Sequence, residues 1–189
     1  MSTVIENLKE AIIGESNAKR KYEFFAEKAE SENYSEVAHL FKAISFAESI
    51  HIKNHLQALS KITNTEVNLE NIVVIDDIEL KKLVDNTRNN VIQAIAGETF
   101  EFKKMYKAFK KDAKKQDYFL AEFSFDLARK AEIIHSKLYI RYLKQLDKKI
   151  NFLPIDIYVC TICGNVELRE APKTCLNCDH DQKFYKKID

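Results

Sequence analysis

Apolar side chains recur every three or four residues along four long stretches of the chain, and this is the period of an amphipathic helix. The stretches cover residues 3–30, 35–59, 87–113 and 117–146. Only short polar segments separate the first stretch from the second and the third from the fourth, so each pair is expected to form a helical hairpin. The pattern therefore predicts a mainly α-helical protein built on a four-helix bundle.

The connection between the two hairpins is long and loses the helical period. Residues 60–75 end in a β-branched run, Ile72-Val73-Val74-Ile75, and predict an extended crossover, which is one of the known bundle topologies. Residues 76–86 can hold a short helix, and Thr87 is the expected N-cap of the helix that follows.

A second change of pattern divides the chain near its end. The helical period stops around residues 151–154, and the cysteines lie beyond this point. We therefore expect two domains, a helical bundle at residues 1–150 and a small metal-binding domain at residues 155–189.

Composition excludes several classes of protein. Of the 189 residues 46% are hydrophobic, which permits a real core, and the 30 basic and 29 acidic residues argue against a strong field for nucleic acid or an anionic membrane. No stretch approaches the roughly 18 apolar residues of a membrane span, and the N-terminus lacks the regions of a signal peptide. All four cysteines lie in the last 30 residues, a pattern that favours a metal over disulfides and predicts a reducing, cytoplasmic location.

A Glu-x-x-His pair occurs twice, as Glu48 with His51 and as Glu132 with His135. Residues three apart are neighbours on one helical face, about 5–6 Å apart at Cβ, so a carboxylate and an imidazole can share one metal. Each pair has a Gly-Glu echo upstream, 33 residues before Glu48 and 34 residues before Glu132. We interpret the repeat as an internal duplication of a helical hairpin.

The echoes add Glu15 and Glu98 to the repeat. A helix rises about 1.5 Å per residue, so a turn midway along each hairpin brings its two glutamates to the same height. Docking the hairpins gathers six side chains at one level: Glu15, Glu48, His51, Glu98, Glu132 and His135. An unpaired buried carboxylate is costly, and this arrangement is the pattern of di-iron and di-manganese proteins. An exposed face or a buried ion pair would explain one such residue but accounts poorly for all six.

The two halves differ three residues after the upstream glutamate, where the first has Ala18 and the second has Glu101. Glu101 is either an extra carboxylate on the metal face or a solvated glutamate on the flank of the helix. Tyr22 lies two turns from Glu15 and either bonds a ligand or fills core. His55 shares the face of Glu48 but lies about two turns away, too far to bind the same metal.

The C-terminal segment contains two Cys-x-x-Cys motifs separated by a short loop. Their residues are Cys160, Cys163, Cys175 and Cys178. This spacing can bring four thiolates to one tetrahedral ion, either iron or zinc, and spacing alone does not choose between the two metals.

With these motifs on one chain, the sequence resembles the rubrerythrin family, a ferritin-like di-iron bundle followed by a rubredoxin-like domain. The motifs that carry the resemblance are Gly14-Glu15, Glu48-x-x-His51, Gly97-Glu98-x-x-Glu101, Met105-Tyr106, Glu132-x-x-His135 and the four cysteines. The resemblance implies that an oxidised Fe-O-Fe centre is bound by Glu15, Glu48, Glu98, Glu101, Glu132 and His135. It also implies that His51 replaces Glu101 on one iron after reduction. Tyr22 and Tyr106 fall where the family has tyrosines next to the ligands, and the cysteines would hold a single iron.

By the same resemblance, the chain is a non-haem di-iron peroxidase that reduces hydrogen peroxide to water in oxidative-stress defence. The iron held by the four cysteines would relay electrons from a partner reductase or a rubredoxin. No Gly-x-Gly-x-x-Gly motif is present, so NADH would act through a separate reductase. The family also implies a head-to-tail homodimer.

Two other functions remain open. One is ferritin-like iron oxidation and storage, and the other is a stress-responsive binding protein whose cysteines hold a structural zinc. Two departures from the family matter: the crossover at residues 60–86 is longer than usual, and the second Cys-x-x-Cys motif lacks the proline and glycine of free rubredoxins.

Overall fold

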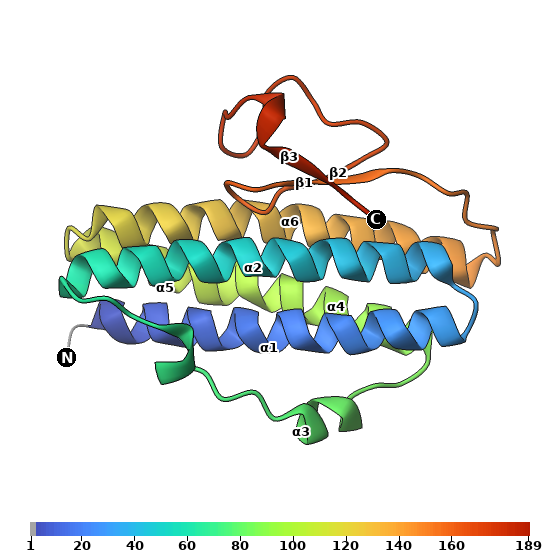
Figure 1. The fold of residues 1–189 in the computed structure, drawn as a ribbon, viewed down its shortest axis with the longest axis horizontal. Helices are drawn as coiled ribbons and strands as arrows, with labels where there is room; N and C mark the ends of the chain where they lie inside the picture. Colours follow the sequence, from blue (N-terminus) through green and yellow to red (C-terminus); the bar gives the residue numbers. More distant parts are fainter. Residues whose placement is uncertain (1–2) are drawn as a thin grey trace.

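The computed structural model describes residues 3–189. Figure 1 shows long helices packed side by side, with a small sheet on one side of them and an excursion of the chain on the other. The long helices are α1 (Thr3–Ser31), α2 (Ser35–Thr63), α4 (Thr87–Phe100), α5 (Tyr106–Lys115) and α6 (Phe119–Asp147). The mainly helical bundle expected from the periodicity is confirmed.

Left-handed residues end or separate the long helices. Asn33 lies between α1 and α2 with φ of 63°, and Asp117 lies between α5 and α6 with φ of 57°. Asn64 ends α2 with φ of 52°. Asn and Asp tolerate this conformation better than other residues with a side chain, so the local sequence favours turns where the hairpins need them.

The third helix of the bundle is not a single α-helix. Between α4 and α5 the chain forms a π-helix, Glu101–Met105. A π-helical turn accommodates an additional residue within a helix. This residue accounts for the unequal spacing of the two halves, because Glu98 and Tyr106 are eight residues apart whereas Glu15 and Tyr22 are seven apart.

The start of α4 corrects one expectation. The N-cap is Asn86, whose side chain accepts a hydrogen bond from the Asn89 amide at 3.0 Å, and Thr87 is the first helical residue. Thr87 instead donates its amide and its hydroxyl to one carboxylate oxygen of Glu32, at 2.7 and 2.6 Å. The prediction of Thr87 as the N-cap is therefore wrong by one residue, because a partner in the first hairpin engages its hydroxyl.

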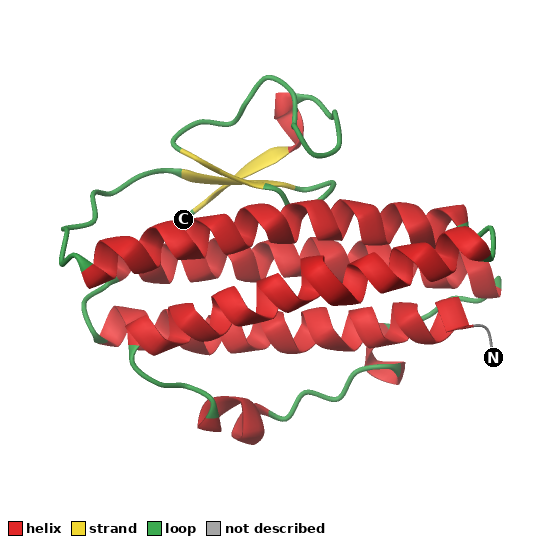
Figure 2. Ribbon diagram, turned by 180° about the vertical axis from the view of Figure 1, so that it is seen from behind, coloured by secondary structure: helices red, strands yellow, loops and turns green. Residues whose placement is uncertain are grey.

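The crossover contains the 3₁₀-helix η1 (Leu69–Asn71) and the short helix α3 (Asp77–Lys82), which the sequence predicted within residues 76–86. Asp76 caps α3 by accepting hydrogen bonds from two amides. Arg20 of α1 holds the crossover through Asp77, with N–O distances of 2.8 and 2.6 Å. The crossover therefore lies along α1, as Figure 2 also shows.

Three short strands form an antiparallel sheet in the order β2-β1-β3. They are β1 (Ile157–Cys160), β2 (Val166–Leu168) and β3 (Tyr185–Ile188), with the 3₁₀-helix η3 (Gln182–Phe184) before the last. The apolar face of the sheet joins the core of the bundle, since Ile157, Val159 and Val166 belong to the same buried cluster as residues of α1 and α2. The division into domains at residues 1–150 and 155–189 stays a prediction.

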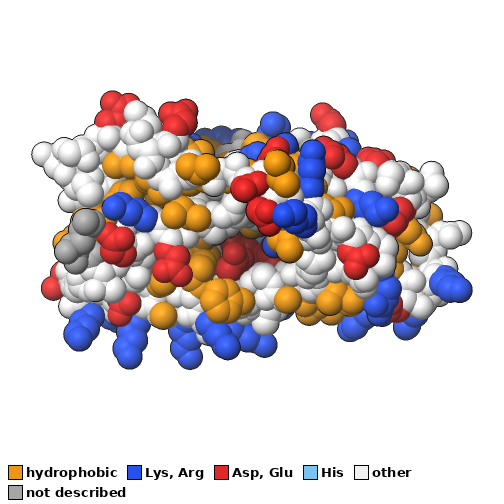
Figure 3. All heavy atoms as spheres, turned by 90° about the horizontal axis from the view of Figure 1, so that it is seen from below, with side chains coloured by type: hydrophobic (Ala, Val, Ile, Leu, Met, Phe, Trp, Pro, Cys, Tyr) orange, Lys and Arg blue, Asp and Glu red, His pale blue; other side chains and the backbone are white. Residues whose placement is uncertain are grey.

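The face of the bundle away from the sheet carries charges of both signs, with basic side chains gathered along one edge (Figure 3). The mixed surface agrees with the near balance of 30 basic and 29 acidic residues. Among residues 3–189, no helix is long and apolar enough to cross a bilayer.

Candidate metal centre

Four buried glutamates and two buried histidines meet at the middle of the bundle, as the repeat predicted. They form two groups whose possible ligand atoms lie within 4.8 Å of one another. One group is Glu15, Glu48, His51 and Glu132, and the other is Glu48, Glu98, Glu132 and His135. Glu48 and Glu132 belong to both groups, so the arrangement suits two neighbouring cations that share two carboxylates.

The two histidines hold corresponding positions in the two hairpins and face the same carboxylates. His51 Nδ1 lies 2.8 Å from oxygens of Glu48 and Glu132. His135 Nδ1 lies 2.8 Å from Glu132 and 3.4 Å from Glu98. The rings are 5.8 Å apart and inclined by only 23°. Each half of the bundle therefore offers one nitrogen to the shared space.

The Nε2 atoms of both histidines, on the side of the ring away from the carboxylates, contact the backbone of the first Cys-x-x-Cys motif. His51 Nε2 is 3.1 Å from the carbonyl oxygen of Cys163, and His135 Nε2 is 3.0 Å from that of Gly164. A carbonyl only accepts, so each Nε2 must carry a proton and donate it. The tautomer that leaves a lone pair on Nδ1, which metal ligation requires, is thereby fixed.

The pKa values of the carboxylates are shifted because these groups are buried close to one another. Burial, followed by the charges of Glu132, Glu15 and Glu98, raises the pKa of Glu48 well above its usual range. Burial also raises the pKa of Glu132. For Glu15, burial acts in the same direction, but the proximity of His51 outweighs it and lowers the pKa to about 2. Ionising all four carboxylates together therefore requires added positive charge.

Unsatisfied oxygen atoms point to the same conclusion. Within the described part of the chain, five buried carboxylate oxygens of this cluster have no hydrogen-bond partner. They belong to Glu15, Glu48, Glu98 and Glu132. Buried polar atoms are normally paired, and carboxylate oxygens with imidazole nitrogens are a donor set that iron accepts. The residues therefore fit a binuclear metal site.

Two tyrosines cross from one hairpin to the other and bond these ligands. The Tyr22 hydroxyl donates to Glu98, and the Tyr106 hydroxyl donates to Glu15. Burial, followed by the nearby carboxylate charges, raises the pKa of both phenols well above the usual value. Both tyrosines therefore remain protonated donors, and Tyr22 bonds a candidate ligand in addition to packing in the core.

The four cysteines form a second cluster. The Sγ atoms of Cys160 and Cys178 are 3.7 Å apart, as are those of Cys163 and Cys175. A tetrahedral ion with metal–sulfur bonds of about 2.3 Å would place its thiolates about 3.8 Å apart, whereas a disulfide needs about 2.05 Å. The observed distances therefore fit a tetrathiolate metal site.

Both Cys-x-x-Cys motifs end in the same left-handed turn. The amide of Gly164 donates to the Cys160 carbonyl at 2.9 Å, and the amide of Asp179 donates to the Cys175 carbonyl at 2.8 Å. The φ angles of these two turn residues are 78° and 60°. The second motif therefore keeps the turn without glycine, because Asp tolerates this conformation.

Comparison with known proteins decides the family. The rubrerythrin family model matches residues 6–143. This chain belongs to the rubrerythrin family. It is similar to rubrerythrin-2 of Clostridium acetobutylicum, with 34% identity over 90% of this chain and 89% of that protein. It is also similar to nigerythrin of Nitratidesulfovibrio vulgaris, with 30% identity over 94% of this chain and 83% of that protein. A solved structure of nigerythrin in a mixed-valence state matches with a TM-score of 0.85 and 26% identity, over 100% of this chain and 88% of that one.

Rubrerythrin-family membership makes the chain an iron-binding oxidoreductase of the di-iron class associated with oxidative stress. The carboxylate–histidine cluster fits the family's di-iron site, and the cysteine cluster fits a rubredoxin-like iron site.

Glu101 is not part of either group of possible metal ligands. It is the first residue of the π-helix and is partly buried. Burial, followed by the charges of Glu15, Glu98 and Glu132, raises its pKa well above the usual range. It therefore stands beside the cluster as an additional carboxyl group, and its role as a ligand stays a prediction.

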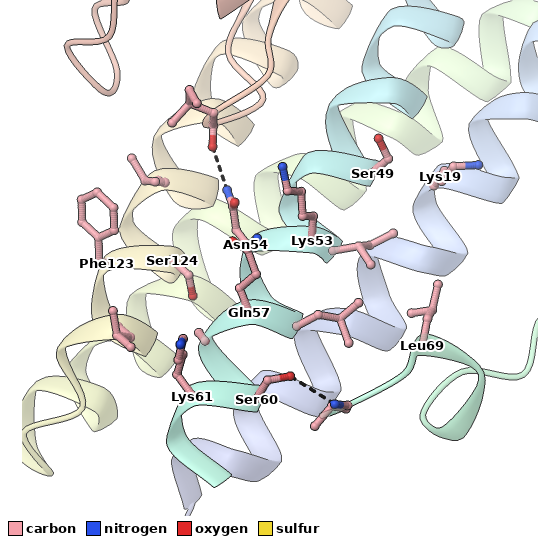
Figure 4. A pocket seen from close by; sticks show the side chains of 17 residues that line it. Lys19, Ser49, Lys53, Asn54, Gln57, Ser60, Lys61, Leu69, Phe123 and Ser124 are labelled. Atoms are coloured by element: carbon pink, nitrogen blue, oxygen red, sulfur yellow. Dashed lines mark hydrogen bonds between the residues drawn. The ribbon is translucent and has the colours of Figure 1, made fainter. Parts of the chain in front are cut away.

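The rubredoxin-like part of the chain packs on its own bundle through hydrogen bonds from side chains to backbone carbonyls. Asn54 of α2 donates to the carbonyl of Ile162 at 2.8 Å, as Figure 4 shows, and Asn177 donates to the carbonyl of Leu127 in α6 at 3.2 Å. A Cβ atom on Gly164 would clash with His51 Nε2, so this close approach requires glycine. No sequence motif signals these contacts, and the head-to-tail homodimer stays a prediction.

Proposed function

We propose that this rubrerythrin-family chain reduces hydrogen peroxide to water. The overall reaction consumes one peroxide, two electrons and two protons and yields two waters. When bound, a di-iron centre supplies two electrons together, which suits a two-electron substrate. The observation that carries the proposal is a pair of possible metal-ligating groups that share Glu48 and Glu132 and are joined by two hydrogen bonds to the backbone of the first Cys-x-x-Cys motif.

In this proposal, each half of the bundle would hold one iron. Glu15 and His51 would serve one ion, Glu98 and His135 would serve the other, and Glu48 and Glu132 would serve both. The shared role is supported by the membership of these two glutamates in both groups. Glu101 would take the place of His51 on one iron when the centre is oxidised, because two ferric ions favour another carboxylate whereas ferrous ions tolerate a neutral imidazole.

The protein side chains organise this site in three ways. The carbonyls of Cys163 and Gly164 hold the two imidazoles with their Nδ1 atoms toward the shared space. The hydroxyls of Tyr22 and Tyr106 donate hydrogen bonds to Glu98 and Glu15, respectively. The surrounding helices bury all six principal ligands completely, which excludes bulk water from them.

Electrons would enter through the iron of the four-cysteine site, which passes them singly. The path from Cys163 to His51 and from Gly164 to His135 lies within one chain and uses one hydrogen bond each. We infer that the donor is a rubredoxin or a reductase, with NADH acting through that separate protein. In a head-to-tail homodimer, the same contacts could instead be made between two copies. Free, clustered cysteines are suited to a reducing cytoplasm.

The test separates electron entry from peroxide chemistry. Cys160→Ser should abolish turnover driven by a reductase, because the tetrathiolate site is lost. The same variant, reduced chemically without oxygen, should still be reoxidised quickly by peroxide, because Glu15 and Glu98 with their partners are intact. Full reductase-driven turnover by the variant would contradict the relay. A site that holds only zinc in protein purified from its own host without oxygen would contradict the electron-transfer function altogether.

A further inference from the structure

A continuous chain of buried hydrogen bonds leads away from the proposed metal ligand Glu15. The Tyr106 hydroxyl donates to Glu15 and also lies 3.0 Å from His55 Nε2. His55 Nδ1 lies 3.0 Å from the Ser124 hydroxyl. Tyr106 and His55 are fully buried, and Ser124 alone among the three keeps some exposure, at 4% of its surface.

Ser124 lies in the wall of a groove between α2 and α6. The groove has a volume of about 830 Å³ and is lined partly by Ile52, Phe123 and Leu127. Figure 4 labels Ser124 at this groove, opposite side chains of α2. The outer end of the hydrogen-bonded chain therefore meets a space that water can enter, and the inner end meets a metal ligand.

The chain can point in either direction. With the imidazole proton on Nε2, Ser124 donates to His55, His55 donates to Tyr106 and Tyr106 donates to Glu15. With the proton on Nδ1, each of these bonds reverses. Ser124 then needs another acceptor, and the carbonyl of Ala121 lies 3.1 Å from its hydroxyl. Burial lowers the pKa of His55 to about 3; the charge of Glu15 opposes this shift and His51 adds a smaller contribution to it, so the ring stays neutral in both states.

We propose that Ser124, His55 and Tyr106 relay protons from the groove to Glu15 during peroxide reduction. A hydronium ion in the groove gives a proton to Ser124 and becomes water, and Ser124 passes its own proton to His55 Nδ1. His55 releases the Nε2 proton to Tyr106, and Tyr106 releases its own to the Glu15 carboxylate. Glu15 passes this proton to a peroxide oxygen and returns to its ionised form. One O–H or N–H bond forms for each that breaks, and no electron moves. The inference rests on the proposed function, which needs two protons for each peroxide.

The other half of the bundle lacks this path, although its packing is equivalent. Tyr22 bonds Glu98 as Tyr106 bonds Glu15, and Tyr139 stands seven residues after Glu132 as His55 stands seven after Glu48. Within the described residues, the Tyr139 hydroxyl has no hydrogen-bond partner. The relay is therefore specific to one half, and Tyr139 provides a matched control.

His55→Gln is the informative variant. A glutamine can bond both neighbours, but its amide does not accept a proton at one end and release another at the other end as imidazole does. His55 and Ser124 act through Tyr106 and are positioning residues, so a defect must appear in proton transfer and not only in folding.

The first measurement uses the full iron-loaded chain, reduced without oxygen and mixed with hydrogen peroxide in H₂O and in D₂O. We expect His55→Gln to be oxidised at least about 10-fold more slowly than wild type, with an altered solvent isotope effect. Tyr139→Phe should match wild type within about twofold, and Ser124→Ala should lie between them. His55→Gln with the wild-type rate and isotope effect would overturn the relay.

The second measurement does not depend on activity. In the zinc-loaded, diamagnetic chain, nitrogen NMR at neutral pH should find His55 with one protonated and one unprotonated nitrogen. Ser124→Ala should shift the His55 resonances, and Tyr139→Phe should not. A doubly protonated His55 in the wild-type chain would overturn the relay whether or not a variant folds. His55 resonances that do not change in a folded Ser124→Ala variant would also overturn it. A relay that fails while wild type reacts with peroxide leaves the peroxidase standing, whereas wild type that ignores peroxide defeats the proposed function itself.

Discussion

The two hairpins of the bundle, α1 with α2 and α4–α5 with α6, repeat one pattern in which the candidate metal ligands correspond and their surroundings differ. Glu15, Glu48 and His51 of the first correspond to Glu98, Glu132 and His135 of the second. Around this common set, the second hairpin contains the π-helix and Glu101, whereas the first has a continuous α-helix and Ala18. The comparison teaches that the duplicated set is what builds two metal positions, while the differences can assign different tasks to the two sides.

Packing next to the ligands is nearly identical in the two halves. The ring of Phe125 lies 5.4 Å from that of His55, and the ring of Phe41 lies 5.3 Å from that of Tyr139. The two sites therefore have similar shape and differ in chemistry. One carries a hydrogen-bonded imidazole and the other a hydroxyl without a partner among the described residues.

The largest effects are expected where the halves share residues. Glu48→Ala and Glu132→Ala should each weaken binding of both bundle irons, because each glutamate belongs to both groups. Loss of a group that only supports a ligand costs roughly 10–100-fold in affinity, so we expect more than about 100-fold here. Iron analysis after dialysis measures the loss of affinity. Retention of one tightly bound bundle iron by either variant would show that this glutamate does not serve both metal positions.

The next effect concerns the contact of both histidines with one turn. Gly164→Ala should push the turn away from His51, since the new Cβ would clash with Nε2. Loss of such a supporting carbonyl should weaken bundle iron binding by roughly 10–100-fold. Asp179→Ala is the matched control, because Asp179 closes the second motif in the same left-handed conformation. Equal iron affinities for the two variants would show that the contact between the first Cys-x-x-Cys turn and the two histidines does not support metal binding.

Stability should also distinguish the corresponding residues His55 and Tyr139. His55→Phe leaves Tyr106 and Ser124 without a shared partner and should lower the free energy of unfolding by about 1–3 kcal/mol. Tyr139→Phe removes a hydroxyl that makes no hydrogen bond within residues 3–189 and should leave it unchanged or slightly raised. Denaturant unfolding of the two variants measures both values. Comparable losses would mean that the difference in hydrogen bonding has no energetic consequence.

A smaller effect is expected at the link between the hairpins. Glu32 accepts two hydrogen bonds from Thr87 at the start of α4, and Glu32→Gln should cost about 1–2 kcal/mol of unfolding free energy. Burial acts to raise the pKa of Glu32, but bonds from Thr87 and Lys28 outweigh it and lower the pKa below its usual 4.5. A lowered carboxyl pKa stabilises the fold at neutral pH, and this contribution is lost as pH falls through the folded-state pKa. Unfolding curves of wild type and variant should therefore converge in acid. A constant difference between them down to acid pH would contradict this assignment.

The sequence predicted the bundle and its ligand level because both follow from periodicity and spacing, which are local. The π-helix at residues 101–105 was not predicted, because a difference of one residue between the two spacings does not by itself distinguish a π-helical turn from a longer loop. The cap at Asn86 was missed because Asn86 and Thr87 are both good caps, and Glu32, 55 residues away, decides between them. His55 could be placed on its helical face, but its bond to Ser124 spans 69 residues and has no local pattern.

The most direct test mixes the fully reduced, iron-loaded protein with hydrogen peroxide and, separately, with oxygen at the same concentration. About three irons per chain are expected, two in the bundle and one in the four-cysteine site. The account predicts that each peroxide oxidises two ferrous ions and that peroxide reacts much faster than oxygen. Oxidation by oxygen as fast as by peroxide, with iron accumulating beyond this loading, would contradict it and favour ferritin-like iron oxidation instead.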